Sequence, residues 1–188
     1  RALSAAAITE ADERAAHERE QAESVRQALV RANLRLEHLP DLSAHSTLVD
    51  LACGNGSIGI YCALTHPQLQ VIASDHSASA VESTLAAARL NSVADRITAA
   101  QDDALSRLPD ASATLITLNP PFHIGAAVHT GIAHRMFAEA GRVLAPGGEL
   151  WTVWNSHLGY RPALERAVGR TRQVARNAKF TVTASWKR

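Results

Sequence analysis

The stretch Asp50–Gly59, which reads DLACGNGSIG, sets the architecture that we expect of this 188-residue chain. It follows a short apolar run that predicts a strand, and it precedes the pattern of a helix. Its glycines allow a tight turn and let a ligand approach the backbone closely, and a helix that begins here presents free N–H groups. The stretch is therefore a candidate ligand-binding turn, although its glycine spacing alone also fits a dinucleotide-binding enzyme.

Short apolar segments and helical patterns alternate after this turn. Repeated β-α-β units demand a mostly parallel sheet with helices on both faces, and the last two strands are close enough in sequence to form an antiparallel pair. We predict an α/β, Rossmann-like, doubly wound fold with a mostly parallel seven-stranded sheet and an antiparallel last strand. The predicted strands are 47–50, 70–74, 96–100, 114–118, 149–154, 171–174 and 180–185. One predicted helix follows Gly56 and ends near residue 65, and the others span 78–90, 129–144 and 162–168.

The chain before this pattern has a different character. Residues 9–37 predict a helix, and the apolar face of this helix is confined to its second half. Pro40 and the polar residues after it end the helix. We therefore divide the chain into an N-terminal helical arm, residues 1–37, and a folded domain, residues 38–188.

The composition is that of a soluble globular protein, with 46% hydrophobic and 20% charged residues. No apolar run reaches the length of about 18 residues that suggests a membrane span. Two cysteines cannot form a disulfide framework, so we expect a cytoplasmic protein without a membrane segment. The nine histidines show no ligand spacing, and we predict no metal.

Charge is unevenly distributed along the chain, although the net charge is only +1. Residues 1–30 carry four Arg against six acids, whereas residues 161–188 carry eight Arg or Lys against one Glu. A basic C-terminal end predicts contact with phosphates. A solvated cationic surface is the alternative interpretation.

Acidic residues follow three of the predicted strands, at the edge where such sheets bind ligands. Asp50 places a carboxylate where pyrophosphate would be repelled but where an ammonium group, such as the amine of S-adenosylmethionine, would be attracted. Asp75 is placed to accept both ribose hydroxyls of either NAD or S-adenosylmethionine. Asp102 or Asp103 is a candidate acceptor for an adenine amino group, with a helix cap as the alternative.

The motif Asn119-Pro120-Pro121-Phe122 follows the fourth predicted strand, and a dinucleotide dehydrogenase has no need of it. A planar exocyclic amine is a poor nucleophile because its lone pair is delocalised. The Asn119 side-chain oxygen and the Pro120 carbonyl offer two acceptors for its N–H groups, which favours a pyramidal nitrogen. The prolines stiffen the loop, and Phe122 offers a face on which a base can stack.

These motifs together resemble a class I S-adenosylmethionine-dependent methyltransferase. Longer strings are more specific, and the resemblance covers about residues 38–188. The strings Asn119–Gly125 (NPPFHIG), Gly147–Leu150 (GGEL), Asn155–Tyr160 (NSHLGY) and Lys179–Val182 (KFTV) resemble the bacterial ribosomal RNA guanine-N2 methyltransferases of the methyltransferase small domain family.

The resemblance implies S-adenosylmethionine as the cofactor, guanine N2 as the methyl acceptor, and ribosomal RNA or a ribosomal subunit as the partner. It also implies an N-terminal companion domain, and we interpret the start at Arg1 as that of a fragment or trimmed chain. The implied cofactor-binding residues are Asp50, Ala52, Cys53, Gly54, Asn55, Gly56, Asp75, His76, Asp102, Asp103 and Asn119; the catalytic residues are Asn119, Pro120, Pro121 and Phe122; and the substrate-binding residues are Phe122, His123, His157 and Tyr160.

The sequence departs from the family pattern at two places. Ala52 stands where the family commonly has a glycine, a mild change because alanine fits a tight turn. The stretch before residue 38 lacks the phenylalanine-and-serine segment that often closes over the cofactor. Three alternatives stay open: an adenine-N6 methyltransferase, a protein-glutamine methyltransferase, and an inactive cofactor- or RNA-binding domain, against which the intact Asn119–Phe122 argues. His123, His157 and Tyr160 also have turn or packing roles as alternatives.

Overall fold

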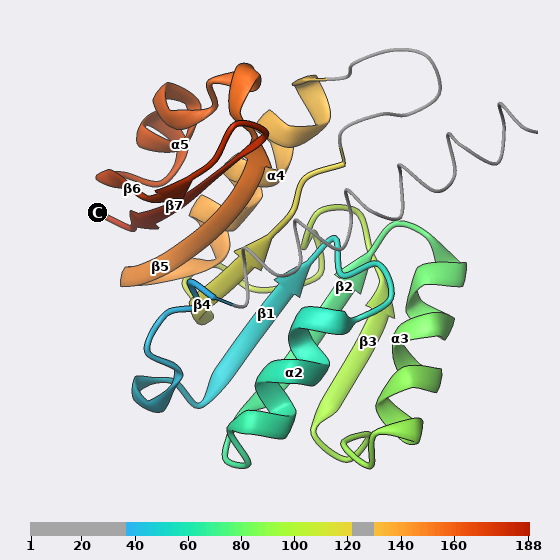
Figure 1. The fold of residues 1–188 in the computed structure, drawn as a ribbon. Helices are drawn as coiled ribbons and strands as arrows, with labels where there is room; N and C mark the ends of the chain where they lie inside the picture. The colour runs from blue at the N-terminus through green and yellow to red at the C-terminus, as the bar shows by residue number, and fades with distance from the viewer. Residues whose placement is uncertain (1–36, 122–129) are drawn as a thin grey trace, which may run out of the picture.

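The structure is a computed structural model that describes residues 37–121 and 130–188 (Figure 1). Most of the predicted N-terminal arm lies outside the described residues. The same is true of Phe122 and His123, so the roles predicted for these two side chains stay predictions.

A single seven-stranded sheet in the order β3-β2-β1-β4-β5-β7-β6 forms the centre of the described chain (Figure 1). β1, β2, β3 and β4 pair in parallel, and β5 is parallel to β4. β7 is antiparallel to both β5 and β6, which confirms the predicted sheet. The strands are β1 (Thr47–Leu51), β2 (Gln70–Asp75), β3 (Ile97–Gln101), β4 (Ala113–Leu118), β5 (Leu144–Asn155), β6 (Thr171–Arg176) and β7 (Phe180–Trp186).

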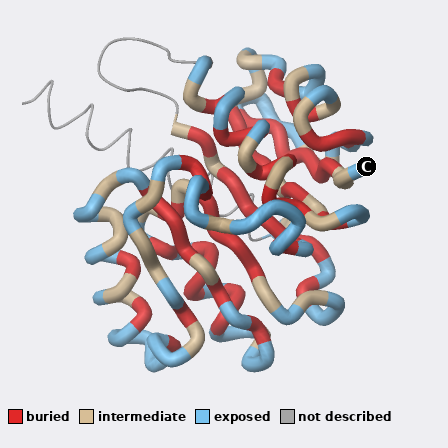
Figure 2. Tube along the Cα trace, turned by 180° about the vertical axis from the view of Figure 1, so that it is seen from behind, coloured by how far each residue is buried: buried red, intermediate tan, exposed pale blue. Residues whose placement is uncertain are grey.

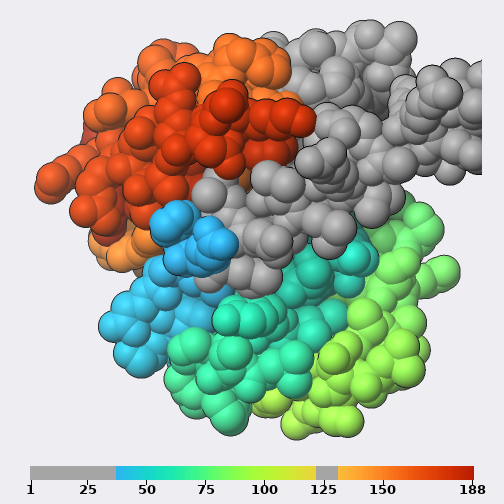
Figure 3. All heavy atoms as spheres, in the orientation of Figure 1, coloured from blue at the N-terminus to red at the C-terminus, as the bar shows by residue number. Residues whose placement is uncertain are grey.

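Helices cover both faces of this sheet, as predicted. α2 (Ser57–Thr65) and α3 (Ala78–Leu90) pack on one face, and α4 (Thr130–Val143) and α5 (Arg161–Ala167) pack on the other. In the space-filling view of Figure 3, the segment from β1 to β3 and the segment from β5 to β7 form opposite sides of the molecule. Short 3-10 turns lie at Leu42–Ala44 (η1) and Ser156–Leu158 (η2).

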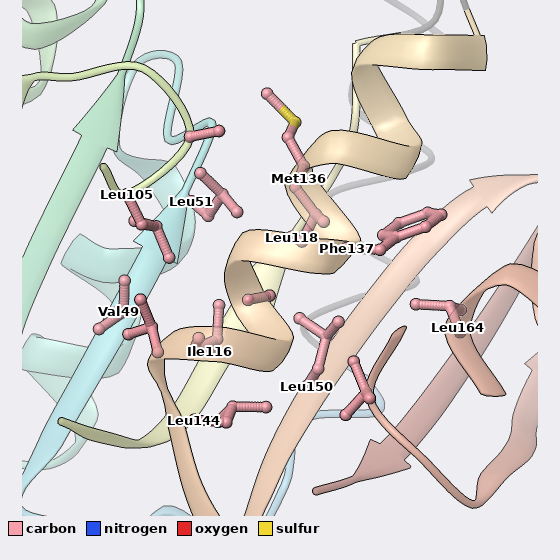
Figure 4. Packing of buried hydrophobic residues seen from close by; sticks show 14 of the residues in the cluster. Val49, Leu51, Leu105, Ile116, Leu118, Met136, Phe137, Leu144, Leu150 and Leu164 are labelled. Atoms are coloured by element: carbon pink, nitrogen blue, oxygen red, sulfur yellow. The ribbon is translucent and has the colours of Figure 1, made fainter. Parts of the chain in front are cut away.

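Alternation of side chains along the strands divides the interior into two main cores. On β1, Leu48 faces the core under α2, whereas Val49 and Leu51 face the core under α4. Figure 4 shows Phe137 and Met136 of α4 lying over β4 and β5. The burial pattern follows the same logic, because the central strands are buried and the outer faces of the helices are exposed (Figure 2). Both faces of the sheet therefore hold it rigid beneath its carboxyl edge.

β5 begins earlier than the sequence predicts. We expected a helix to 144 and a strand from 149, but β5 already begins at Leu144. Leu144 pairs with Ala113, and the register then shifts so that Glu149 pairs with Leu115. Gly147 adopts a positive φ of 78°, so the Pro-Gly-Gly stretch forms an irregularity within the strand and not a separate loop. Within the described residues, no helix has the length and apolar character needed to cross a membrane.

Candidate functional site

The turn between β1 and α2 is built from residues with left-handed backbone. Ala52, Gly54 and Gly56 have φ values of 57°, 58° and 74°. Glycine adopts this conformation freely, but alanine does so at a cost of roughly 1–2 kcal/mol. Ala52 therefore fits the turn with some local strain. The Cys53 N–H donates to the carbonyl of Ser74, which ties this turn to the end of β2.

Asp50 holds the turn from beneath. The residue is only 1% exposed. Its Oδ1 accepts from the Thr117 hydroxyl at 2.9 Å, and its Oδ2 accepts from the Gly59 N–H of α2 at 3.2 Å. The prediction that this carboxylate attracts a cofactor's ammonium group stays a prediction. In the structure Asp50 positions β1, β4 and the first turn of α2 relative to one another.

Asp75 lies at the end of β2 and reaches back to the same turn. Its Oδ2 accepts from the Gly54 N–H at 2.9 Å, and its Oδ1 accepts from the Ser77 N–H at 3.0 Å. His76 follows, with its Nδ1 3.3 Å from Asp75 Oδ1. A carboxylate oxygen has a second lone pair, so these bonds leave acceptor capacity for ligand hydroxyls.

Thr84 of α3 braces the turn from the side, and sequence reasoning missed it. Its hydroxyl donates to the Gly54 carbonyl at 3.0 Å and lies 3.5 Å from Cys53 Sγ. Burial raises the pKa of the Cys53 thiol to about 11, against the smaller lowering effect of the Thr84 hydrogen bond. Cys53 therefore supports the turn as a neutral thiol. A lone threonine on a predicted helix carries no signal of such a contact.

The two acids after β3 are engaged in different ways. Asp102 accepts from the Ser106 hydroxyl and from the N–H groups of Asp103 and Arg107. Burial acts to raise the pKa of Asp102, but these hydrogen bonds outweigh it and hold the pKa below its usual range. Asp103 forms a bidentate ion pair with Arg135 of α4, with both N···O distances at 2.6 Å. No helix follows Asp102 directly, so these bonds hold the turn at residues 104–107, and the predicted contact with an adenine amino group stays a prediction.

An open cavity of about 460 Å³, including the space at its mouth, lies at the carboxyl edge beside β1, β2 and β3. Its lining combines acids with an apolar wall from the strands and α4. The lining residues are Leu51, Ala52, Asp75, His76, Asp102, Asp103, Ala104, Pro121, Ile132, Arg135 and Met136.

This larger cavity is lined by only some of the residues that were predicted to bind the cofactor. It brings together Ala52, Asp75, His76, Asp102 and Asp103, whereas Asp50, Cys53, Gly54, Asn55 and Gly56 do not line it. These five residues form and support the turn instead. Sequence reasoning missed the wall that α4 supplies. The signal was the helical spacing i, i+3, i+4 of Ile132, Arg135 and Met136.

A second, smaller cavity lies on the other side of the loop that follows β4. Asn119, Pro120 and Pro121 line it together with Trp154, Asn155, Leu158 and Tyr160. Pro121 also lines the larger cavity. Within the described part of the chain, no hydrogen bond is seen to the Asn119 carboxamide. The loop therefore forms a partition between two cavities and leaves a polar side chain available at that partition.

The structure places the predicted substrate-binding residues Tyr160 and His157 in different environments. Tyr160 is only 4% exposed, and its ring makes edge contacts with Phe137 and Trp154 at centroid distances of 5.2 and 6.1 Å. Burial raises the pKa of Tyr160, so its hydroxyl stays protonated. Tyr160 thus packs in the core and lines the smaller cavity at once. His157 is exposed on η2 and is not part of either cavity lining.

No group of three or more His, Cys, Asp or Glu in residues 37–121 and 130–188 is arranged to hold a metal ion. Acids lie on the side of β2 and β3, and amide and aromatic groups lie on the side of β4 and β5.

The sheet order and this edge define a Rossmann-like methyltransferase domain. The chain belongs to the methyltransferase small domain family, which matches residues 29–184. It is similar to the ribosomal RNA large subunit methyltransferase G of Streptomyces coelicolor, with 43% identity over 152 residues that cover 81% of this chain and 40% of the relative. The protein of the same name from Shewanella amazonensis is 40% identical over 158 residues, which cover 83% of this chain and 41% of the relative.

Solved structures of methyltransferases are also similar to this chain. The T. thermophilus 16S rRNA N2 G1207 methyltransferase, in complex with AdoMet and guanosine, has a TM-score of 0.65 and 28% identity over 76% of this chain and 37% of its own. An O-methyltransferase family protein from Burkholderia thailandensis has a TM-score of 0.69 at 15% identity, over 87% of this chain and 57% of its own, and shows the fold alone. The chain spans about two fifths of the length of the curated relatives that it matches.

Proposed function

We propose that this domain transfers a methyl group from S-adenosylmethionine to an exocyclic amine, and that the amine is guanine N2 in ribosomal RNA. The observation that carries the proposal is the position of Pro121. This residue lines both the larger, acid-lined cavity and the smaller, aromatic-lined cavity. A transfer reaction needs a donor site and an acceptor site that meet, and the Asn119–Pro121 loop is where these two cavities meet.

The larger cavity suits S-adenosylmethionine. Asp75 is placed at the end of β2, where its free lone pairs can accept ribose hydroxyls. Leu51, Ile132 and Met136 provide an apolar wall for a flat base. The neighbouring carboxylates also favour a cationic ligand over a pyrophosphate. When bound, S-adenosylmethionine supplies an electrophilic methyl group on a sulfonium.

The Asn119–Pro121 loop suits an amine. The Asn119 carboxamide oxygen and the Pro120 carbonyl act as two acceptors for the two N–H groups of an exocyclic amine, which favours a pyramidal nitrogen with its lone pair directed toward the larger cavity. Two successive prolines keep the backbone of this loop stiff. Phe122, whose role stays a prediction, supplies a stacking face for the base.

The guanine assignment rests on the relatives. The curated relatives are named as ribosomal RNA methyltransferases, and the T. thermophilus structure is described as an N2 G1207 methyltransferase with guanosine bound. Adenine N6 offers the same pair of N–H groups, so the loop chemistry alone does not separate the two bases. An N-terminal companion domain, ribosomal RNA or a ribosomal subunit as partner, and a cytoplasmic location complete the proposal.

Incubation of the chain with isotope-labelled S-adenosylmethionine and bacterial ribosomal RNA or subunits, followed by mass spectrometry of the nucleosides, tests this proposal. We expect labelled N2-methylguanosine. Asn119→Ala should lower turnover by roughly 10²–10³-fold, the scale for loss of one positioned polar group at a reacting centre. Its affinity for S-adenosylmethionine in calorimetry should stay close to that of the unaltered chain.

Asn91→Ala is a matched control, because Asn91 caps the far end of α3 and bonds only to the Ala87 carbonyl through its side chain. This control should keep full turnover. Labelled N6-methyladenosine in place of N2-methylguanosine would reject the guanine assignment and keep the loop mechanism. Full turnover in Asn119→Ala would reject the mechanism.

A further inference from the structure

The basic residues on and beside β6 do not form one surface, because this strand places them at opposite edges of the sheet. β7 is antiparallel to β5 and to β6, so β6 runs parallel to β5. β6 therefore begins at the edge far from the cavities and ends at the carboxyl edge. Arg170 and Arg172 lie at its start, and Arg176 lies at its end.

The strand register gives the separation. Arg176 pairs with Thr181 of β7, and Thr181 pairs with Trp154 of β5, which lines the smaller cavity. Arg170 bonds to Trp186 through its carbonyl, and Trp186 pairs with Glu149. Glu149 is five positions earlier than Trp154 on β5, which is roughly 16 Å at about 3.3 Å per residue.

The turn from β6 to β7 is fixed against the end of β5. The Ser156 N–H donates to the Lys179 carbonyl at 2.8 Å, and the Ser156 hydroxyl lies 2.9 Å from the Thr181 hydroxyl. Asn177 accepts from the Lys179 and Phe180 N–H groups at 2.9 and 2.7 Å. The backbone that carries Lys179 is thus held rigidly beside η2, which supplies Leu158 to the smaller cavity.

Arg176 and Lys179 form what we call the carboxyl-edge basic pair. Both side chains are exposed. Three strand spacings of about 4.8 Å separate β6 from β4, so the backbone of Arg176 lies roughly 14 Å from that of Asn119 at nearly the same level. An arginine side chain directed toward the cavity shortens this gap further. In Figure 1 the β6–β7 turn lies on the side of the sheet where β5 ends.

Charge at the carboxyl edge is separated between the two cavities. Asp75, Asp102 and Asp103 line the larger cavity. Glu165 is the sole acid in residues 151–188, and it lies in α5, paired with Arg161 at 2.9 Å. The side toward the cationic ligand is therefore acidic, and the side beyond the smaller cavity is basic.

From this placement we infer that the carboxyl-edge basic pair binds the phosphates of the RNA strand that flank the target nucleotide, and that Arg170 and Arg172 do not. The inference rests on the proposed function, because it takes the smaller cavity as the site of the target base. Arg172 lies near the opposite edge, and its guanidinium is 5.7 Å from the centre of the Trp186 ring. The basic C-terminal end thus contacts RNA at one edge only.

Salt-dependent RNA binding tests this inference. The probe is a short fluorescein-labelled single-stranded RNA with unpaired guanosines, measured by anisotropy across a salt series with the full chain. Each phosphate contact contributes roughly 0.7 to the slope of log affinity against log salt for a single strand. Arg176→Gln with Lys179→Gln should therefore reduce the slope by about 1.4, and Arg176→Lys with Lys179→Arg should keep it.

The matched control is Arg170→Gln with Arg172→Gln, which removes the same charge near the start of β6 and should leave the slope unchanged. An equal reduction in both double variants, or a reduction in neither, would overturn the inference. Calorimetry with S-adenosylmethionine is run on every variant. Retained cofactor binding with an unchanged RNA slope would reject the basic pair alone, whereas absence of cofactor binding in the unaltered chain would reject the proposed function.

Discussion

Replacing Gly56 by alanine tests whether α3 fixes the turn between β1 and α2. Gly56 has a φ of 74°, and a Cβ built on it lies 2.6 Å from Thr84 Cγ2. The left-handed backbone costs alanine about 1–2 kcal/mol, and overpacking adds about 1–3 kcal/mol. A less flexible unfolded chain offsets about 0.4–1 kcal/mol of this sum. We expect Gly56→Ala to lower the free energy of unfolding by about 1–5 kcal/mol, with the middle of this range near 3 kcal/mol.

Gly54 provides the control within the same turn. Its φ of 58° is equally left-handed, but a Cβ built on it meets nothing within 4 Å. Ala52 already adopts a φ of 57° two residues earlier, so the turn tolerates an alanine in this conformation. Gly54→Ala should therefore carry the backbone cost alone, a net loss of about 1 kcal/mol.

Equilibrium urea unfolding followed by circular dichroism measures both losses, and an unchanged slope against urea shows that the unfolded state is comparable. Thr84→Ala removes the two side-chain atoms closest to the added methyl group. Because Thr84→Ala also removes the hydrogen bond to the Gly54 carbonyl, it should cost at least about 1 kcal/mol less in the Gly56→Ala background than in the unaltered chain, the lower end of the overpacking cost. A Gly54→Ala loss as large as that of Gly56→Ala, or strict additivity of Gly56→Ala and Thr84→Ala, would refute the steric argument.

Three further outcomes follow from the same edge. Asp75→Ala should weaken S-adenosylmethionine binding in calorimetry by at least about 1.5–3 kcal/mol, the value of one charge-assisted hydrogen bond, and undiminished binding would remove Asp75 from the site. Asp102→Asn should destabilise the fold at neutral pH. Because the folded pKa of Asp102 is lowered, the stability that its charge contributes is present above about pH 3.9 and is lost as the pH falls below that value. A loss from this substitution that is the same at all pH values in urea unfolding would contradict this. Cys53, with its pKa near 11, and Cys62, which is fully buried, should react with a thiol reagent at neutral pH only as the chain unfolds, and rapid labelling of the native chain would be inconsistent with the packing.

Local sequence patterns were sufficient for most of the fold. The bounds of α3 and the starts of β1, β2, β6 and β7 agree with the predictions because apolar alternation, helix caps and turn residues act over a few residues. β5 was predicted to begin too late, since Pro-Gly-Gly normally ends regular structure. Pairing of Leu144 with Ala113 across the sheet overrides that local preference.

The candidate site divides in the same way. Sequence reading identifies the acids, the glycine turn and the Asn119–Phe122 motif. Each of them has a characteristic chemistry and follows a strand that ends at the ligand-binding edge of the sheet. Whether an acid faces a cavity is not local. Asp50 and Asp75 look alike in sequence, and each accepts two hydrogen bonds from the chain. Only Asp75 lines the larger cavity.

Contacts between distant segments explain what pattern reading missed. Thr84 contacts Gly54, which lies 30 residues earlier in the chain, and Arg135 pairs with Asp103, which lies 32 residues earlier. Both contacts form because the helices that carry Thr84 and Arg135 pack at the same edge of the sheet. In the sequence, the basic residues of the C-terminal end form one continuous group. The antiparallel direction of β7 places Arg170 and Arg176 at opposite edges of the sheet, because strand direction is fixed by pairing with β5 across the sheet and not by the residues of the strand itself.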